Sequence, residues 1–316
     1  MVGSDGAPSA PPAEPAVVED PATAEVVGEV RTHRIDGEET LLDVAVDHGL
    51  GYLQIIAANP GVDPWLPGSG RDVVIPAARI IPQGRREGIV INLPERRLYA
   101  FEAGRLTGDF PVGIGRDGYE TPRGTTRIVR RRVNPTWYPT PSARRDDPSL
   151  PAAVRPGPDN PLGTRALDLG WPRYLIHGTN KPFGIGRRAS RGCIRMYDAD
   201  IVRLFESVRV GTTVRVVDQP VKAGWRGGRL WLEAHPTVRQ GAQLEEEGQL
   251  SLAPAVDARS LLRGKVGPIG DEAIDWLAVE RILRERRGIA EPVSESVRPA
   301  AAPVIEARAQ PLAAPR

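Results

Sequence analysis

Apolar and polar residues alternate along the middle of the chain with the period of two that β-strands require. Residues 88–93 and 97–101 are apolar runs separated by Pro94-Glu95, a pattern typical of a hairpin. Further strands are expected at 106–114, 127–133, 174–176 and 212–217. Over residues 198–208 the apolar side chains recur every three or four positions and predict a helix. The pattern indicates a mainly β domain, a β-sandwich with short helices, over residues 88–218.

The pattern before this domain predicts a small α+β module over residues 31–82. Thr40 and Asp43 are spaced as in a helix capping box, in which each residue bonds the backbone of the other. The expected order is strand, helix, helix, strand, at residues 32–35, from Thr40 to Gly49, at 52–58 and at 73–75.

The remaining segments are expected to be an extension and two tails. Residues 219–290 form the extension, with a hairpin around Gly227-Gly228 and an amphipathic helix over 271–287. Residues 1–30 and 291–316 are rich in Ala and Pro. Because such segments cannot bury enough apolar surface to offset their loss of entropy, a disordered linker and a disordered tail are expected.

One long segment inside the β domain lacks any periodic pattern. Residues 139–165 are rich in Pro, Asp and Arg. Structureless loops longer than about 15 residues in a compact domain are usually either functional or disordered. We expect this segment to form a lid over a site.

Composition narrows the classes of function only slightly. The chain has 316 residues and a net charge of +2, which gives no argument for a nucleic-acid partner. A single cysteine excludes an intrachain disulfide. No stretch approaches the ~20 apolar residues of a membrane span, and the start of the sequence shows no signal-peptide pattern.

That single cysteine, Cys193, is the best candidate for chemistry. An apolar strand at 174–176 places His177 at its end, and a glycine-rich stretch then returns the chain to Gly192 and Cys193. Arg191 and other nearby cations favour the thiolate. A thiolate with an imidazole base forms a nucleophilic pair.

Other interpretations of the cysteine are weaker. A lone cysteine is most often a small buried hydrophobic residue, but its Ser-Arg-Gly and Arg neighbours are too polar for an ordinary core strand. A zinc site needs more thiolate or imidazole ligands than the stretch holds. A redox couple would need a second cysteine. No metal and no cofactor are therefore expected.

The stretch resembles the catalytic motif of the L,D-transpeptidases (YkuD type), in particular their ErfK/YbiS-like branch. His-Gly-Thr-Asn at 177–180 is followed by Ser-Arg-Gly-Cys-Ile-Arg-Met at 190–196. Many members have a histidine where this chain has Arg191. The resemblance covers roughly residues 32–235. Within it, residues 31–82 resemble a LysM module, which binds cell-wall glycan.

The pattern and the resemblance assign roles to individual residues. Cys193 is the expected nucleophile and His177 the expected general base. The backbone N–H groups of Gly192 and Cys193 are expected to stabilise the oxyanion, and the Gly178 carbonyl to orient the imidazole. Substrate contacts are expected from the side chains of Ser190, Arg191, Arg195, Thr179 and Trp137. Arg195 in particular suits a substrate carboxylate, because a guanidinium binds it bidentately.

The substrate follows from the resemblance alone. It implies peptidoglycan stem peptides, with transfer of the acyl group to another stem, as a 3–3 cross-link, or to an outer-membrane protein or lipoprotein. Water as the acceptor would make the chain an L,D-carboxypeptidase, and loss of the chemistry would leave a glycan-binding protein. The resemblance also implies a periplasmic or cell-envelope location.

Overall fold

The alternating segments assemble into one central sheet. In the computed structural model, which describes residues 24–250, 257–266 and 270–296, eight strands lie in the order β13-β11-β10-β9-β14-β5-β6-β7. Their bounds are β5 Gly88–Asn92, β6 Arg97–Glu102, β7 Arg105–Pro111, β9 Gly124–Val133, β10 Arg165–Leu169, β11 Leu175–His177, β13 Ile194–Arg195 and β14 Thr213–Val217. The short strands β8 (Ile114–Gly115) and β12 (Arg188–Ser190) pair beside it.

The sheet curls, and β9 belongs to both of its halves. Residues 124–127 of β9 pair with β14, and residues 128–133 pair with β10. The expected β-sandwich is therefore corrected to a single continuous, curled sheet. One long strand runs through both halves, so no break in the hydrogen-bond ladder separates two sheets. A shared apolar core, with Ile91, Leu98 and Ile176 fully buried, fills the inside.

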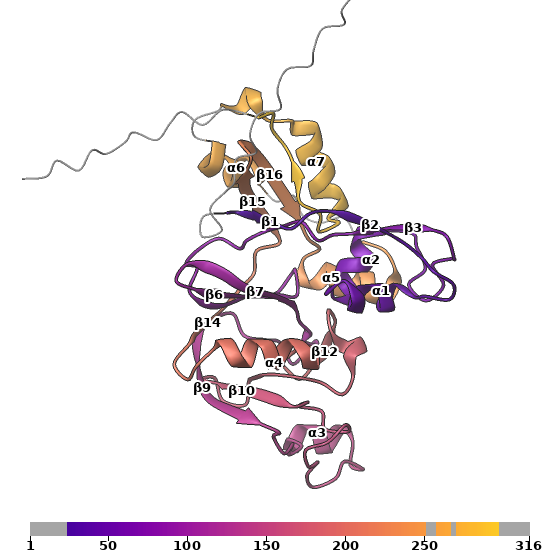
Figure 1. Cartoon of the computed structure of the whole chain (residues 1–316), viewed down its shortest axis with the longest axis vertical. Coiled ribbons are helices and arrows are strands. Elements are labelled where there is room, and N and C mark those ends of the chain that lie inside the picture. The colour runs from indigo at the N-terminus through magenta and orange to yellow at the C-terminus, as the bar shows by residue number, and fades with distance from the viewer. Residues whose placement is uncertain (1–23, 251–256, 267–269, 297–316) are drawn as a thin grey trace, which may run out of the picture.

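Helix α4 packs against strands β10 and β11. It spans Asp198–Ser207, which agrees with the predicted helix. Its apolar side chains Ile201, Leu204 and Phe205 are buried in the same core cluster as Ile176 and Ile194. The apolar face that the sequence predicts is thus the face that packs on the core. Figure 1 shows α4 lying above β9 and β10.

The N-terminal module has the predicted order. Strand β2 (Arg31–Arg34) pairs antiparallel with β3 (Asp72–Ile75), and helices α1 (Leu41–Asp47) and α2 (Tyr52–Ala58) lie between them in the chain. The Thr40–Asp43 capping box is present. No single helix in the described ranges is long and apolar enough to cross a membrane; only α1 and α2 together, bent by 115°, reach that length and composition.

The expected linker and the expected loop are both corrected in part. Val26–Val27 form β1, which pairs with β4 (Arg79–Ile80), so order begins before residue 30; residues 1–23 lie outside the described residues. Within 139–165, α3 spans Pro141–Asp146 because Thr140 accepts a hydrogen bond from the Ala143 N–H and proline suits the first helical turn.

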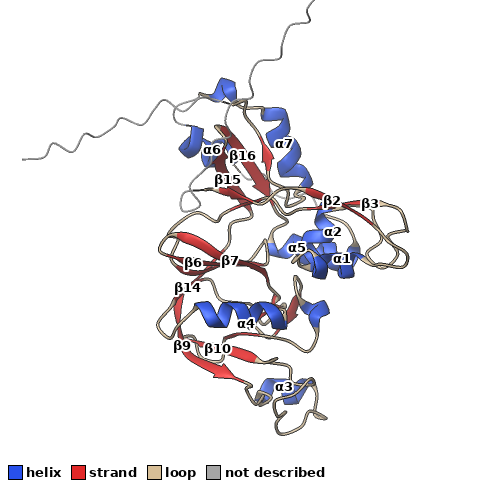
Figure 2. Ribbon diagram, viewed as in Figure 1, coloured by secondary structure: helices blue, strands red, loops and turns tan. Residues whose placement is uncertain are grey.

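The C-terminal extension forms a second small sheet with its own core. The predicted hairpin is β15 (Val221–Arg226) and β16 (Arg229–Ala234). Helices α5 (Val238–Glu247), α6 (Ala258–Val266) and α7 (Trp276–Glu285) follow. Figure 2 shows α6 and α7 beside the hairpin and α5 beside the N-terminal module. A capping box of Thr237 and Gln240 opens α5.

Two expectations for this extension are corrected. The helix expected over 271–287 is a short 3₁₀ turn, η2 (Asp271–Ala273), and then α7 (Trp276–Glu285), because the Asp275 side chain caps α7 at the Ala278 N–H. The expected tail begins too early, since Glu291–Pro292 form β17 on β16 and Val293 is fully buried. Residues 297–316 lie outside the described residues.

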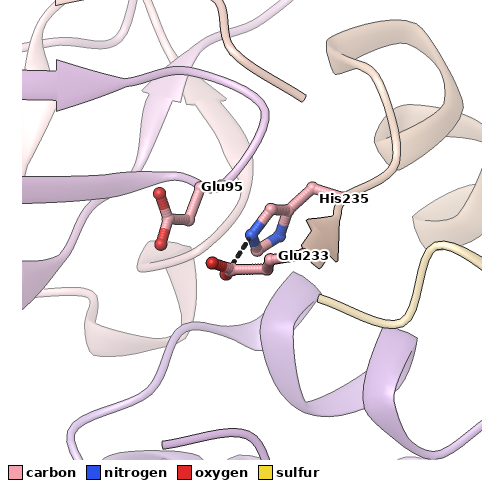
Figure 3. A group of neighbouring side chains, drawn as sticks. All are labelled: Glu95, Glu233 and His235. Atoms are coloured by element: carbon pink, nitrogen blue, oxygen red, sulfur yellow. Dashed lines mark hydrogen bonds and ion pairs between the residues drawn. The ribbon is translucent and has the colours of Figure 1, made fainter. Parts of the chain in front are cut away.

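A buried ion-pair network joins the three parts of the chain. Lys222 Nζ lies 2.8 Å from a Glu95 carboxylate oxygen, 3.1 Å from Glu233 and 2.6 Å from the Ile80 carbonyl oxygen. His235 Nε2 lies 2.6 Å from Glu233, and Figure 3 shows Glu95, Glu233 and His235 converging. Burial alone would raise the pKa of Glu233, but Lys222 and His235 outweigh it and lower the pKa to about 2.

Glu95, Glu233 and His235 also have the types of donor atom that bind metal ions, and their ligand atoms lie within 4.8 Å of one another. The Lys222 ammonium already supplies the positive charge between the two carboxylates. The cluster is therefore an internal ion-pair network. It fixes the central sheet, through Glu95, against the C-terminal hairpin and the β4 strand that leads from the N-terminal module.

Candidate active site

Strand pairing brings Cys193 and His177 to one face of the sheet. Strands β11 and β13 are parallel, with Ile176 opposite Ile194 and His177 opposite Arg195. Ile176 and Ile194 are fully buried in the core. Because side chains alternate along a strand, their neighbours point to the opposite face. His177 and Arg195 lie on that face. Cys193, the residue just before β13, and Leu175 lie on it too.

All four of these side chains line a cleft of about 550 Å³. Its walls come from segments far apart in the sequence: the 118–120 turn, β9, the segment from Thr136 to Ala143, residues 161–162, and the 173–175 strand entry. The segment that was expected to be a lid thus forms one wall, through Thr140, Ser142 and Ala143. Its motion stays a prediction.

The imidazole of His177 is oriented by the backbone. Nδ1 lies 2.6 Å from the Gly178 carbonyl oxygen, which is an acceptor, so Nδ1 carries the proton. Nε2 is then the nitrogen with a free lone pair. His177 is 4% exposed. This burial, together with the Arg195 charge, lowers the pKa of His177 to about 4, against the raising effect of the Gly178 carbonyl.

The thiol of Cys193 is partly exposed and also uncharged at rest. Its sulfur lies 3.6 Å from the Arg173 carbonyl oxygen. Burial of the sulfur raises the pKa of Cys193, although the Leu175 N–H and the Arg195 charge act in the opposite direction. A neutral imidazole in the same cleft as a neutral thiol is an arrangement suited to general-base activation of the thiol.

Ser190 and Thr121 fix the loop that carries the cysteine. Ser190 Oγ donates to the Cys193 carbonyl oxygen at 2.5 Å and accepts the Gly192 N–H at 3.0 Å. Thr121 Oγ1 donates to the Gly192 carbonyl oxygen at 2.8 Å. Gly192 has φ +100°, and a Cβ there would meet the Tyr174 ring at 2.6 Å. The loop therefore requires glycine before Cys193.

This loop corrects one expected role. Gly192 was expected to donate its N–H to an oxyanion, but Ser190 Oγ already accepts it. Within the described part of the chain, the Cys193 N–H has no such acceptor. Ser190 lines the cleft, but its hydroxyl proton is used by the loop, so its substrate contact is limited to a remaining lone pair.

The other expected contact residues divide into two groups. Trp137, Arg191 and Arg195 line the cleft. Arg191 binds Asp146 of α3 at 2.6 Å, so one of its donors is engaged. Thr179 does not line the cleft; its hydroxyl accepts the Lys181 N–H at 3.0 Å and fixes the turn after His177. Its expected contact with substrate is therefore replaced by a structural role.

Several cleft residues escaped the sequence analysis. Tyr119, Glu120, Arg132, Arg173 and Tyr174 all line the cleft. Arg132 contributes its charge to the environments of both His177 and Cys193. Tyr174 was assigned only as a strand residue. The sequence does contain aromatic and charged residues just outside the motif, which are candidates for a binding cleft. It does not show which of them the fold brings together around Cys193.

The neutral resting pair leads to a pH prediction. We expect the rate of Cys193 alkylation by iodoacetamide to keep rising with pH beyond neutrality, because the raised pKa of the thiol leaves little thiolate below it. A stopped-flow or quench series with mass detection measures this rate. A pH-independent plateau between about pH 5 and about pH 8, as a resting ion pair gives, would contradict it.

Fold and site together define a mainly β protein with a curled sheet and a cysteine–histidine cleft on one face. The family model of the L,D-transpeptidase catalytic domain (YkuD) matches residues 86–216. The chain is 40% identical to the probable L,D-transpeptidase ErfK/SrfK of Salmonella typhimurium, over 85% of this chain and 88% of that one. It is 38% identical to the probable L,D-transpeptidase YbiS of Escherichia coli, over 78% and 80%.

The chain therefore belongs to the L,D-transpeptidase family. The family assignment identifies a transferase-type enzyme. The catalytic domain of the E. faecium L,D-transpeptidase aligns with 43% of this chain and all of that chain, at 18% identity and a TM-score of 0.35. The assignment rests on the sequence relatives.

Proposed function

We propose that this protein is an L,D-transpeptidase that acts on peptidoglycan stem peptides through an acyl-thioester on Cys193, with His177 as general base and acid. One observation carries the proposal. The imidazole at the end of β11 and the thiol of the residue just before the parallel strand β13 line the same cleft, with the imidazole tautomer held by the Gly178 carbonyl.

The first step is acylation of the cysteine. His177 Nε2 takes the thiol proton, and the sulfur attacks the carbonyl carbon of the scissile peptide bond. The C–S bond forms and the C–N bond breaks. The imidazolium then gives its proton to the departing amine. The Gly178 carbonyl accepts from Nδ1–H throughout and stabilises the imidazolium, since the donor carries more positive charge in that state.

The tetrahedral oxyanion needs a donor within the same cleft. The Cys193 N–H is the proposed donor, because the Gly192 N–H is engaged by Ser190 Oγ. Ser190 and Thr121 hold this peptide group in place by their bonds to the loop. The two hydroxyls thereby position the donor without touching the reacting atoms.

The second step transfers the acyl group. An acceptor amine attacks the thioester carbon, the C–N bond forms and the C–S bond breaks. His177 removes the amine proton and returns it to the sulfur. The acceptor is a diamino acid of another stem or a lysine of an outer-membrane protein or lipoprotein. Release of the acyl group to water instead would make the protein an L,D-carboxypeptidase.

The substrate and the location complete the proposal. Arg195 and Arg191 line the cleft as cations for substrate carboxylates, and Trp137 offers an aromatic wall. The strand, helix, helix, strand order of residues 31–75 supports a LysM-like module that binds cell-wall glycan. Because peptidoglycan lies outside the cytoplasmic membrane, we place the protein in the periplasm or cell envelope.

Intact-protein mass spectrometry after incubation with a carbapenem tests the nucleophile. We expect one covalent adduct per chain, because a strained lactam carbonyl in the cleft acylates Cys193 as the peptide does. Cys193→Ala is the matched control and should carry no adduct. A wild-type protein that stays unmodified while its thiol remains free and unoxidised would sink the acyl-transfer mechanism.

A further inference from the structure

A second hollow adjoins the cleft and shares Arg195 with it. Its volume is about 670 Å³. We call it the aromatic groove, and its lining residues are Trp65, Asn180, Lys181, Pro182, Phe183, Gly184, Arg187, Ala189 and Arg195. Apart from Arg195, none of these lines the catalytic cleft. The groove is thus a separate compartment that meets the cleft at one side chain.

Two modules build the groove, and each contributes an exposed aromatic ring. Trp65, from the loop between α2 and β3, is 54% exposed, and Phe183, from the 3₁₀ turn η1 (Pro182–Gly184), is 61% exposed. Two large aromatic side chains exposed in the same hollow form an apolar patch of the kind that marks a binding groove. The N-terminal module therefore packs against the catalytic domain and supplies one wall of the groove.

The contact between the two walls is specific. The backbone N–H groups of Tyr52 and Leu53, at the start of α2, donate to the Ile185 and Gly186 carbonyls at 3.1 and 3.2 Å. A Cβ on Gly186 would meet the Tyr52 nitrogen at 2.2 Å, so the close approach requires glycine. These bonds hold the 182–189 segment of the groove against the N-terminal module.

The charged side chains of the groove are all positive. Lys181, Arg187 and Arg195 line it, and no carboxylate among the described residues does. Arg187 stacks on the Tyr52 ring at 3.5 Å. Arg195 has no acidic partner within the described ranges, and its buried Nε lacks a hydrogen-bond acceptor. The chemistry that fits is an anion with apolar or ring-bearing parts.

The groove adjoins the base through Arg195 and through the turn that follows His177. Arg195, which borders it, is the register partner of His177, whereas Cys193 lies two residues earlier in the chain. Residues 180–184, which line the groove, begin two positions after Gly178. A molecule in the groove therefore approaches the reaction from the His177 side, where the amine of the second step must lose its proton.

We propose that the aromatic groove binds the acyl acceptor, as a peptide that carries free carboxylates, and presents its amine to His177. This inference rests on the proposed transpeptidase function and assigns the second substrate its own binding site. A neutral saccharide would also stack on Trp65 and Phe183. We favour the peptide because the groove has three positively charged side chains and no negatively charged one among the described residues. A ligand with carboxylates would pair with these cations, whereas a neutral saccharide would not.

Kinetics with separate donor and acceptor test this assignment. The donor is a synthetic stem tetrapeptide. The acceptor is a stem tripeptide that ends in a diamino acid, used with its carboxylates free and with them amidated. We expect Trp65→Ala, Phe183→Ala and Lys181→Glu each to raise the acceptor KM by about tenfold. The donor KM and the rate of carbapenem acylation should not change.

The controls separate this inference from the proposed function. Leu66→Ala removes an exposed apolar side chain, 81% exposed, that does not line the groove, and should leave the acceptor KM unchanged. The amidated acceptor should show a raised KM with wild type and lose most of its sensitivity to Lys181→Glu. Absence of acylation in wild type would remove the function itself.

Two further results would overturn the groove assignment while leaving acylation intact. The first is an acceptor KM that all three variants leave unchanged. The second is binding of N-acetylglucosamine oligomers that depends on Trp65 and Phe183, without any effect of these variants on transfer. That second result would make the groove a glycan site.

Discussion

Replacement of His177 by glutamine is expected to slow acylation of Cys193 by roughly two to four orders of magnitude, the usual contribution of a positioned general base. The resting thiol is protonated because burial raises its pKa, so it needs a base to become a nucleophile. The lowered pKa of His177, about 4, leaves the imidazole neutral and able to accept a proton at neutral pH. Glutamine preserves size and polarity but cannot take the proton.

The measurement is the single-turnover rate of carbapenem or donor acylation as a function of pH. For wild type, the base is lost as pH falls through the pKa of His177, so the rate should fall only in strongly acidic solution, near pH 4. For His177→Gln the rate should instead follow hydroxide and the fraction of thiolate. Equal acylation rates for the two proteins at neutral pH would show that His177 is not the general base.

Replacement of Lys222 by methionine is expected to lower the free energy of unfolding by about 3–5 kcal/mol, the range for breaking a buried ion pair by removing one partner. Lys222, Glu95 and Glu233 are fully buried. Methionine has a similar length but no charge. The two carboxylates would then face each other without a cation in a medium that solvates them poorly.

Denaturant unfolding monitored by tryptophan fluorescence measures this change. Lys265→Met is the matched control, because Lys265 pairs with Glu25 at 2.6 Å in a partly exposed place and should cost about 1 kcal/mol or less. Adding Glu95→Gln and Glu233→Gln to Lys222→Met should recover much of the loss, since it removes the unpaired charges. A cost for Lys222→Met no larger than that of the control would contradict the network's role.

Local sequence patterns predicted most of the secondary structure correctly. The Thr40 capping box and the helix over residues 52–58 follow from contacts within one turn, so neighbours in the chain are sufficient to specify them. The same holds for the hairpin around Gly227-Gly228, whose turn type depends on the glycines. The missed α3 had a local signal as well, in Thr140 and Pro141.

The missed strands have partners that lie far away in the chain. Strand β17 is only two residues long and exists because β16, about sixty positions earlier, offers it an edge. Strand β1 depends in the same way on β4. A strand of only two residues is too short for an alternating pattern to predict it. The continuous curl of the main sheet likewise depends on β9 bonding to β10 on one part of its length and to β14 on the other.

The sequence by itself determined the chemistry of the site: the lone Cys193, the preceding histidine, and the glycines that let the chain return between them. Tertiary structure alone decided how that chemistry is arranged. It set the neutral state of the pair through burial, engaged the Gly192 N–H through Ser190, and brought Trp65 beside the segment after His177. These features depend on desolvation and on contacts between distant segments, which a linear pattern of residues does not contain.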